Sequence, residues 1–423
     1  MNRFLHGHAT HPDWRMALAI AAAQVDAQRE EPGAAASPTL GWVYVTSAFA
    51  PQVAALLDEL RQRWPGVEWV GASGVGIAAS GVEYFDEPAL SLMLCDLPVE
   101  RFRVFSGARP LAGFAAHTAQ VHADPGTADL AELIHDLSGR VASGYLFGGL
   151  ASATQRAVHI AGGPLAGGLS GVAFDRSVGL VSRVTQGCQP IGPERVVTDA
   201  DRNVVITLDG EPALDCLLRD VGLEGVEPRV ALPRLREVLV GLSDVEHGPA
   251  EGEMPATQSA FEARGRRGAF GAETRVRHLI GFDPGRRGIA IADAPERGTQ
   301  LAFCSRNVEA ARRDLRRICA EVREELEPEE LPLAAAVAIK SRGPLDALTA
   351  PSHGIAGAIY VSCAGRGGAH FGAPSAELAL VRHALGDVPL VGFFAGGEIA
   401  RRHLYGYTGV LTVFGKGAGF AAD

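Results

Sequence analysis

The same succession of predicted elements occurs near both ends of this chain, and this repetition limits the possible folds more than any other feature. Each copy reads as a strand, a helix, a glycine-bearing strand, a hairpin and a final apolar strand, at 42–94 and again at 359–414. A weaker copy lies between them at 144–174. Repetition on this scale predicts an internally duplicated α/β fold with mixed sheets, whose functional sites lie where equivalent strand ends converge.

Length and composition predict two domains. The chain has 423 residues, of which 47% are hydrophobic and 21% charged, as in ordinary globular proteins. The proline-bounded stretch 228–233 is the predicted boundary, which gives a first domain over 1–233 and a second over 234–423. The polar segment 247–271 is rich in glycine, arginine and glutamate and is predicted to be a mobile insertion.

Charge and cysteine content argue against several function classes. A net charge of −10 gives no electrostatic support for nucleic-acid binding. No apolar run approaches the roughly 20 residues of a membrane-spanning helix, and the N-terminus lacks the apolar core of a signal peptide. The six cysteines are scattered and form no C-x-x-C pair. We therefore expect a reduced, cytoplasmic protein with neither a nucleic-acid nor a membrane partner.

Several short motifs recur in an order that is typical of one known family. In the first half they are His11-Pro12-Asp13-Trp14, Val70-Gly71-Ala72-Ser73, Gly148-Gly149-Leu150-Ala151-Ser152 and the segment 203–213. In the second half they are Ser362-Cys363-Ala364-Gly365-Arg366-Gly367, Gly392-Phe393-Phe394-Ala395-Gly396-Gly397-Glu398 and Tyr407-Thr408. With this order and spacing, nearly the whole chain resembles the FIST domain family, in its N-terminal and C-terminal halves.

The resemblance implies a sensory module for a small ligand, for which an amino acid or a similar small metabolite is the expected class. Relatives often carry a signalling output domain, but none is visible in this sequence, so the resemblance implies signalling to a separate protein. Some members of the family bind haem and report nitric oxide. A haem-based gas sensor is therefore one alternative, although the expected cofactor is none.

Residues at the ends of the repeated strands are the candidates for ligand binding. Arg366 lies in a glycine-rich loop after a predicted strand, where it could hold a carboxylate in a bidentate manner. Glu398 ends the neighbouring repeat strand, where it could receive an ammonium group. The alternative is that these two side chains pair with each other or face water. The predicted ligand-binding residues are Ser73, Ser362, Cys363, Arg366, Gly397 and Glu398.

An enzyme that uses Cys363 or paired carboxylates in the same cleft is the other alternative. A thiolate nucleophile needs a base within hydrogen-bond reach, and His370 and His403 are the candidates. A small buried residue at a tight strand end is the structural interpretation of Cys363, and the sequence favours it. We therefore predict no catalytic residue.

No metal site is predicted. His6, His8 and His11 have a spacing that resembles a metal site, but they lie in a terminal segment with no nearby cysteine and no obvious carboxylate ligand. Gly74-x-Gly76-x-x-Ala79 superficially matches a dinucleotide fingerprint, which requires a following helix. A hairpin is predicted there instead, so the sequence does not support a nucleotide site.

Overall fold

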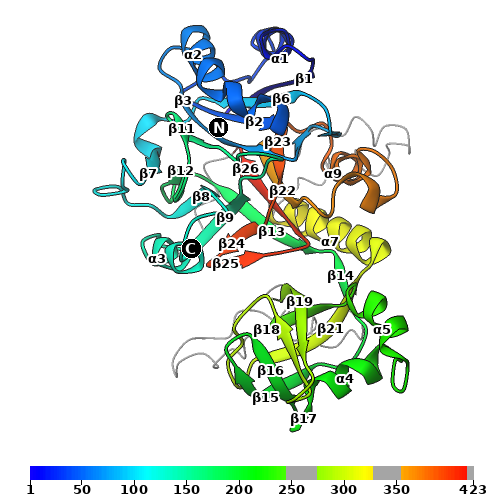
Figure 1. Ribbon diagram of the computed structural model, residues 1–423. Coiled ribbons are helices and arrows are strands. Elements are labelled where there is room, and N and C mark those ends of the chain that lie inside the picture. The colour runs from blue at the N-terminus through cyan, green and yellow to red at the C-terminus, as the bar shows by residue number, and fades with distance from the viewer. Residues whose placement is uncertain (244–273, 327–353, 417–423) are drawn as a thin grey trace, which may run out of the picture. The chain divides into compact units, whose positions relative to one another are not determined.

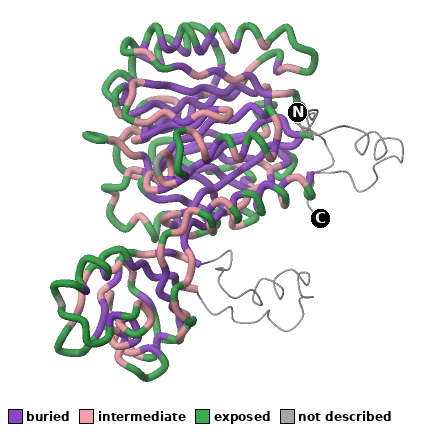
Figure 2. The backbone as a smooth tube through the Cα atoms, turned by 90° about the vertical axis from the view of Figure 1, so that its right-hand side faces the viewer, coloured by how far each residue is buried: buried purple, intermediate pink, exposed green. Residues whose placement is uncertain are grey.

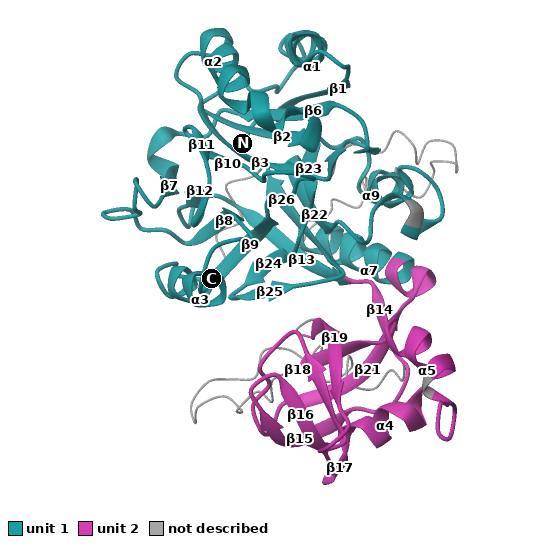
Figure 3. Ribbon diagram, in the orientation of Figure 1, with its two compact units in different colours: residues 1–185, 312–423 teal, residues 186–311 magenta. Residues whose placement is uncertain are grey.

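The computed structural model describes residues 1–243, 274–326 and 354–416 (Figure 1). The predicted insertion 247–271 lies outside the described residues. Two compact units make up the chain, one from residues 1–185 and 312–423 and one from residues 186–311 (Figure 3). Among the described residues, no helix is long and apolar enough to cross a membrane.

The first unit contains three six-stranded sheets. The first sheet has, in spatial order, β1 (Leu5–Thr10), β6 (Ala89–Cys95), β2 (Leu40–Thr46), β3 (Glu68–Gly74), β10 (His159–Ala161) and β11 (Pro164–Leu165). The second has β7 (Phe102–Ser106), β12 (Leu169–Phe174), β8 (Thr118–Ala123), β9 (Tyr145–Leu150), β24 (Glu398–Arg401) and β25 (His403–Tyr405). The third has β13 (Leu180–Gln186), β26 (Thr408–Gly415), β22 (Ile355–Cys363), β23 (Leu390–Ala395), β4 (Gly76–Ala79) and β5 (Val82–Phe85).

The predicted duplication is confirmed, and the weak middle copy is a complete third one. In the first repeat, β2 pairs in parallel with β3 and antiparallel with β6. In the second repeat β8 pairs in the same way with β9 and β12, and in the third repeat β22 pairs with β23 and β26. The hairpin of each repeat leaves its own sheet: β4–β5 joins β23, β10–β11 joins β3, and β24–β25 joins β9. Each repeat therefore completes the sheet of another.

The register of the strands is the same in all three repeats. Gly71, Gly148 and Gly392 lie opposite Val43, Val121 and Tyr360 of their parallel neighbours. A Cβ atom at these glycines would come within 1.8, 1.9 and 1.7 Å of a backbone carbonyl oxygen. Only glycine permits such a close approach of two strands. These glycines therefore identify equivalent positions in the three repeats.

The helices of the first unit cover the outer faces of its sheets, and the inner faces meet in one core. They are α1 (Trp14–Gln28), η1 (Ser47–Gln52), α2 (Val53–Arg63), η2 (Val99–Arg101), α3 (Leu130–Gly139), α7 (Val308–Leu326), η4 (Gly368–Phe371) and α9 (Ala376–Leu385). Asp13 caps α1, accepting from the N–H of Arg15 at 2.9 Å. The shared core includes Trp42, Phe147 and Phe393, one from each repeat. Figure 2 shows buried residues running along these strands.

The second unit has its own eight-stranded sheet and its own core. Its elements are β14 (Cys188–Pro190), β15 (Arg195–Asp201), β16 (Val204–Leu208), β17 (Glu211–Pro212), α4 (Ala213–Asp220), α5 (Pro228–Leu235), β18 (Leu239–Ser243), β19 (Arg275–Asp283), β20 (Gly288–Ile291) and β21 (Gln300–Arg306). An additional pairing of β18 with β21 closes the strand path into a ring.

The compact units divide the chain differently from the two predicted sequence halves. Residues 228–233, where the sequence predicts a boundary, lie in α5 inside the second unit. The physical reason is the cyclic exchange of hairpins: the first repeat completes the sheet of the third, the third that of the second, and the second that of the first, although the first and third repeats lie at opposite ends of the chain. The first compact unit is therefore built from two segments that are separate in the sequence.

Candidate functional site

Arg366, the predicted ligand-binding cation, lies in a fully buried ion pair. Its side chain follows the end of β22, and its Nε donates to Oε1 of Glu377 at 3.0 Å. Its Nη1 donates to the carbonyl oxygen of Thr185 at 3.3 Å, and its guanidinium carbon Cζ lies 5.4 Å from the centre of the Phe371 ring. Both members of the pair are buried completely, with 0% exposed area. The geometry thus gives Arg366 an internal partner.

Further hydrogen bonds hold the carboxylate of that ion pair. Glu377 also accepts from the hydroxyl of Tyr360 at 2.7 Å and from Ser362 at 3.1 Å. A buried carboxylate that accepts several hydrogen bonds and faces a guanidinium is compensated for its lost hydration. Tyr360, Ser362, Arg366 and Glu377, which we call the buried ion-pair cluster, therefore form one hydrogen-bonded network at the end of β22.

Glu398 and Cys363 lie beside this cluster. Oε2 of Glu398 accepts from the N–H of Thr408 at 3.2 Å and from its hydroxyl at 2.7 Å. Burial raises the pKa of Glu398 to about 8, against the lowering effect of Thr408, Arg366 and Cys363. Burial, followed by the charge of Glu398, raises the pKa of Cys363 to about 12. A thiol with this pKa is a poor candidate for a thiolate nucleophile.

Ser73 and Gly397 hold hairpins in place at two other strand ends. The hydroxyl of Ser73 accepts from the N–H of Val158 at 3.0 Å, and its N–H donates to the carbonyl oxygen of the same residue at 2.8 Å. The carbonyl oxygen of Gly397 accepts from Leu150 at 2.8 Å. The structure thus brings Ser362, Cys363, Arg366 and Glu398 together, whereas Ser73 supports a different strand end. Their roles in ligand binding stay predictions.

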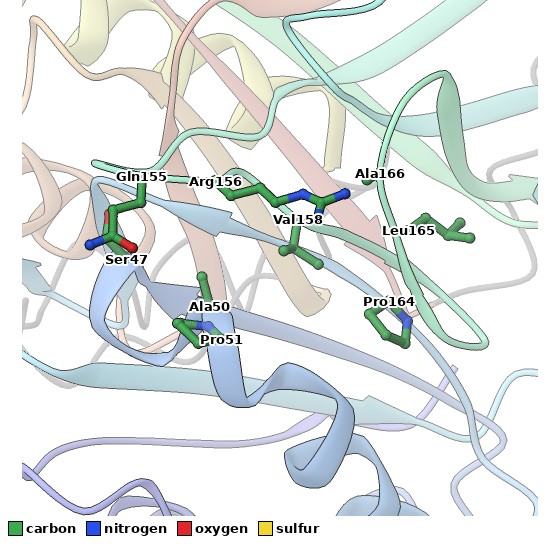
Figure 4. Close-up of a pocket in the computed structure, with 9 residues that line it drawn as sticks. All are labelled: Ser47, Ala50, Pro51, Gln155, Arg156, Val158, Pro164, Leu165 and Ala166. Atoms are coloured by element: carbon green, nitrogen blue, oxygen red, sulfur yellow. The ribbon is translucent and has the colours of Figure 1, made fainter.

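A cavity lies at the strand end that Ser73 supports. It has a volume of about 370 Å³, within the usual range of small-ligand sites. Figure 4 shows Arg156 running along one side of it, over Val158, with Ala50 and Pro51 on another side. The lining residues are Ser47, Ala50, Pro51, Gln155, Arg156, Val158, Pro164, Leu165 and Ala166.

Two repeats build this cavity. The first supplies Ser47 and η1, which follow directly after β2. The second supplies the connection from β9 to β10, whose start is held by Ser152. Ser152 donates to the carbonyl oxygen of Phe394 at 2.7 Å and accepts from the N–H of Val75 at 2.9 Å. With Ser73 holding Val158, both ends of the loop 153–157 are fixed.

The cavity is mostly apolar and carries positive charge. Arg156 is the one charged side chain among the described residues that line it, and it forms no salt bridge within that part of the chain. Asp124 lies close enough for Arg156 to act on its pKa, but its two oxygens accept from the N–H groups of Gly126 and Gly167. The lining therefore suits a small ligand with an apolar body and an anionic or neutral polar group.

Sequence reasoning missed these lining residues, although a signal for them exists. His159 lies eleven residues after Gly148, whereas the equivalent Ile77 and Glu398 lie six residues after Gly71 and Gly392. The second repeat thus has five additional residues at this connection. Because Gln155 and Arg156 fall within them, aligning the three repeats would have pointed to this loop.

The N-terminal histidines bind neighbouring side chains. Nδ1 of His6 lies 3.1 Å from Oε1 of Gln28, and Nδ1 of His8 lies 2.6 Å from the hydroxyl of Tyr84. Burial, with the neighbouring His8 and Arg3 as smaller causes, lowers the pKa of His6 to about 4. Within the described part of the chain, no group of three or more potential metal ligands is found.

Comparison with known proteins identifies both halves of the sequence. The sequence model of the FIST N domain matches residues 39–211, and that of the FIST C domain matches residues 231–401. The chain is 30% identical over 432 residues to an uncharacterised protein of Mycobacterium bovis, covering 96% of this chain and 97% of the relative. It is 29% identical to an uncharacterised protein of Mycobacterium tuberculosis, covering 96% of this chain and 98% of the relative.

Proposed function

Because the chain belongs to the FIST family, a family of sensory domains for signal transduction, we propose that it senses a small ligand in the cavity beyond β2. The ligand is an amino acid or a similar small metabolite. The protein acts in the cytoplasm and passes its signal to a separate partner protein.

The observation that carries this proposal is the cavity itself. Its volume of about 370 Å³ accommodates a small metabolite, and its apolar wall of Pro51, Val158 and Leu165 can bury the body of such a molecule. Arg156 and Gln155 supply polar groups at one side, which can fix the orientation of the ligand. The predicted residue Arg366 pairs with the buried carboxylate of Glu377.

The cavity also lies where a ligand can influence more than one repeat. The loop 153–157 begins at Ser152, which joins Phe394 of the third repeat to Val75 of the first. A ligand that contacts Gln155 and Arg156 therefore acts on a loop whose anchor connects all three repeats. Such a junction supports a sensory function, because ligand binding can bias contacts far along the sequence.

A thermal-shift screen of amino acids and small organic acids tests the proposal. A ligand bound by the native state alone raises the melting temperature. Ala166→Trp places a large ring at the exposed rim of the cavity and should abolish the shift. Ala131→Trp, on the exposed face of α3, is the matched control and should keep it. If no compound shifts the wild type, or if Ala166→Trp responds like the control, the proposal fails.

A further inference from the structure

The three exchanged hairpins place different side chains at one equivalent position. In the second strand of each hairpin, Tyr84 lies opposite Ile77, Tyr405 opposite Glu398, and Leu165 opposite His159. These partners are equivalent residues of the three hairpins. The residues one position earlier are therefore equivalent too, and they are Glu83, Leu404 and Pro164.

At the strand end of the third repeat, this position holds a carboxylate. Glu83 reaches from its hairpin to the loop after β22, where its Oε2 accepts from the N–H of Gly368 at 2.8 Å. Its Oε1 accepts from the N–H groups of Glu377 and Leu378 at 3.0 and 3.2 Å. The side chain is 8% exposed. At the strand end of the third repeat, a carboxylate of the chain itself thus accepts hydrogen bonds from these backbone N–H groups.

The second repeat fills the same position with an apolar side chain. Leu404 packs against the cluster that contains Ile134 and Leu137 of α3. At the first repeat the position belongs to Pro164, which has no carboxylate and lines the cavity. Pro164 therefore places no polar side chain at the equivalent position, and it lies beside the cavity of about 370 Å³.

The additional loop of the second repeat brings a cation to this cavity. Gln155 and Arg156 belong to the five residues that the other two repeats lack, and both line the cavity. Arg156 forms no salt bridge with the rest of the described chain. A guanidinium in a mostly apolar lining favours a carboxylate, to which it can donate two hydrogen bonds.

Building on the function proposed above, we infer that the cavity takes a small carboxylic acid with an apolar body, whose carboxylate stands where the third repeat has that of Glu83. Arg156 binds this carboxylate, and the wall of Val158, Pro164 and Leu165 contacts the apolar body. Within the described residues, the lining contains no acidic side chain to receive an ammonium group. An acid without an α-amino group therefore binds more tightly than the corresponding amino acid, because the ammonium loses its hydration without gaining a partner.

Two matched sets of compounds test this inference by calorimetric titration of the full-length protein. One set is 3-phenylpropanoate, phenylalanine and 2-phenylethylamine, and the other is 4-methylpentanoate, leucine and 3-methylbutylamine. We expect the carboxylate to bind most tightly in at least one set, the amino acid more weakly, and the amine not measurably.

Variants assign this order to Arg156. Arg156→Ala should weaken carboxylate binding by about 10- to 100-fold, the scale of a charge-assisted hydrogen bond. Arg156→Lys should restore part of it. Arg140→Ala, at an exposed site after α3, is the control and should bind like the wild type. Gln155→Glu adds an acid to the lining and should shift the preference toward the amino acid.

The outcomes separate this inference from the proposed function. Equal or tighter binding of the amines, or unchanged carboxylate affinity in Arg156→Ala, overturns the inference. If the carboxylates do not bind but a neutral or cationic compound does, and Ala166→Trp abolishes that binding, the sensory cavity stands and the ligand class is wrong. If nothing in the screen or in either set binds, both fail.

Discussion

The strand ends of the first and third repeats have the same topology but differ in the side chains that lie there. The end of β22 holds the buried ion-pair cluster of Tyr360, Ser362, Arg366 and Glu377. Beyond β2, the equivalent space is a cavity of about 370 Å³ with Arg156 at its side. In the third repeat both charges come from the chain, whereas Arg156 is the one charged side chain among the described residues that line the cavity of the first.

This difference teaches how a duplicated fold separates stability from binding. Arg366 and Glu377 are buried as a pair, so removal of either one leaves the other charge buried without its partner. An arginine at an exposed loop beside an apolar cavity contributes little to stability and is available to a ligand. The comparison therefore predicts that equivalent-looking charged residues have different effects when they are substituted.

Arg366→Ala should give the largest effect on stability. The substitution leaves Glu377 buried without its cation, which costs about 3–5 kcal/mol of unfolding free energy. Arg156→Ala, the matched change at the open strand end, should stay within about 0.5 kcal/mol of the wild type. Urea denaturation of both variants measures this, and similar losses in the two would break the comparison.

The pH dependence of stability should reveal Glu398. Its pKa is about 8 in the folded protein, above the ordinary value of 4.5, so the folded state keeps a proton that the unfolded state has lost. Stability from this group is therefore present below pH 4.5 and is lost as the pH rises through 8, on the order of 1 kcal/mol per pH unit.

Glu398→Gln should remove this loss. The amide cannot ionise. Between pH 5 and pH 8.5, the unfolding free energy of the variant should therefore fall less than that of the wild type, and the separation of the two pKa values of Glu398 sets the size of this difference. Denaturation at several pH values gives the two curves, and parallel curves would exclude Glu398 as the group responsible.

Glu83→Ala should have a smaller effect on stability. It removes the acceptor of three backbone N–H groups at the strand end of the third repeat, which costs about 1–3 kcal/mol for donors left without a partner. Hydrogen exchange should become faster at Gly368, Glu377 and Leu378. Unchanged exchange at these amides would show that Glu83 does not hold this loop.

Pro164→Glu should have the smallest effect on stability while it inhibits binding. The substitution gives the first repeat the carboxylate that the third repeat already has at the equivalent position. A tethered carboxylate competes with the ligand for Arg156, and we expect about tenfold weaker binding of 3-phenylpropanoate, or about 1.4 kcal/mol. Pro164→Gln is the uncharged control, and equal affinity in the two variants would contradict the equivalence of the hairpins.

Much of the fold could be predicted from the sequence, because the repeats preserve an order of elements and the glycines at close strand contacts. Gly71 and Gly392 stand in recognisable strands, so two copies are evident. The exchange of hairpins could not be predicted, since a hairpin has the same local pattern whichever sheet it joins. This exchange is why the compact units do not follow the predicted halves.

The site was harder to predict than the fold. Ser362, Cys363, Arg366 and Glu398 come together near one strand end, as their position in the repeat suggests. Sequence could not show that Glu377, from the following helix, lies within 3.0 Å of Arg366. The cavity depends on a loop and a hairpin of the second repeat and on η1 of the first, so no single motif identifies it.

The most direct test of the account is a calorimetric titration of 3-phenylpropanoate and 4-methylpentanoate into the wild type and into a variant that lacks residues 153–157. The deletion gives the second repeat the loop length of the other two while it keeps Ser152 and Val158, the two anchors of the loop. We predict that the wild type binds at least one acid and that the deletion variant, with its fold intact by circular dichroism, binds neither. Equal binding to both proteins would contradict the claim that this loop and its cavity form the ligand site.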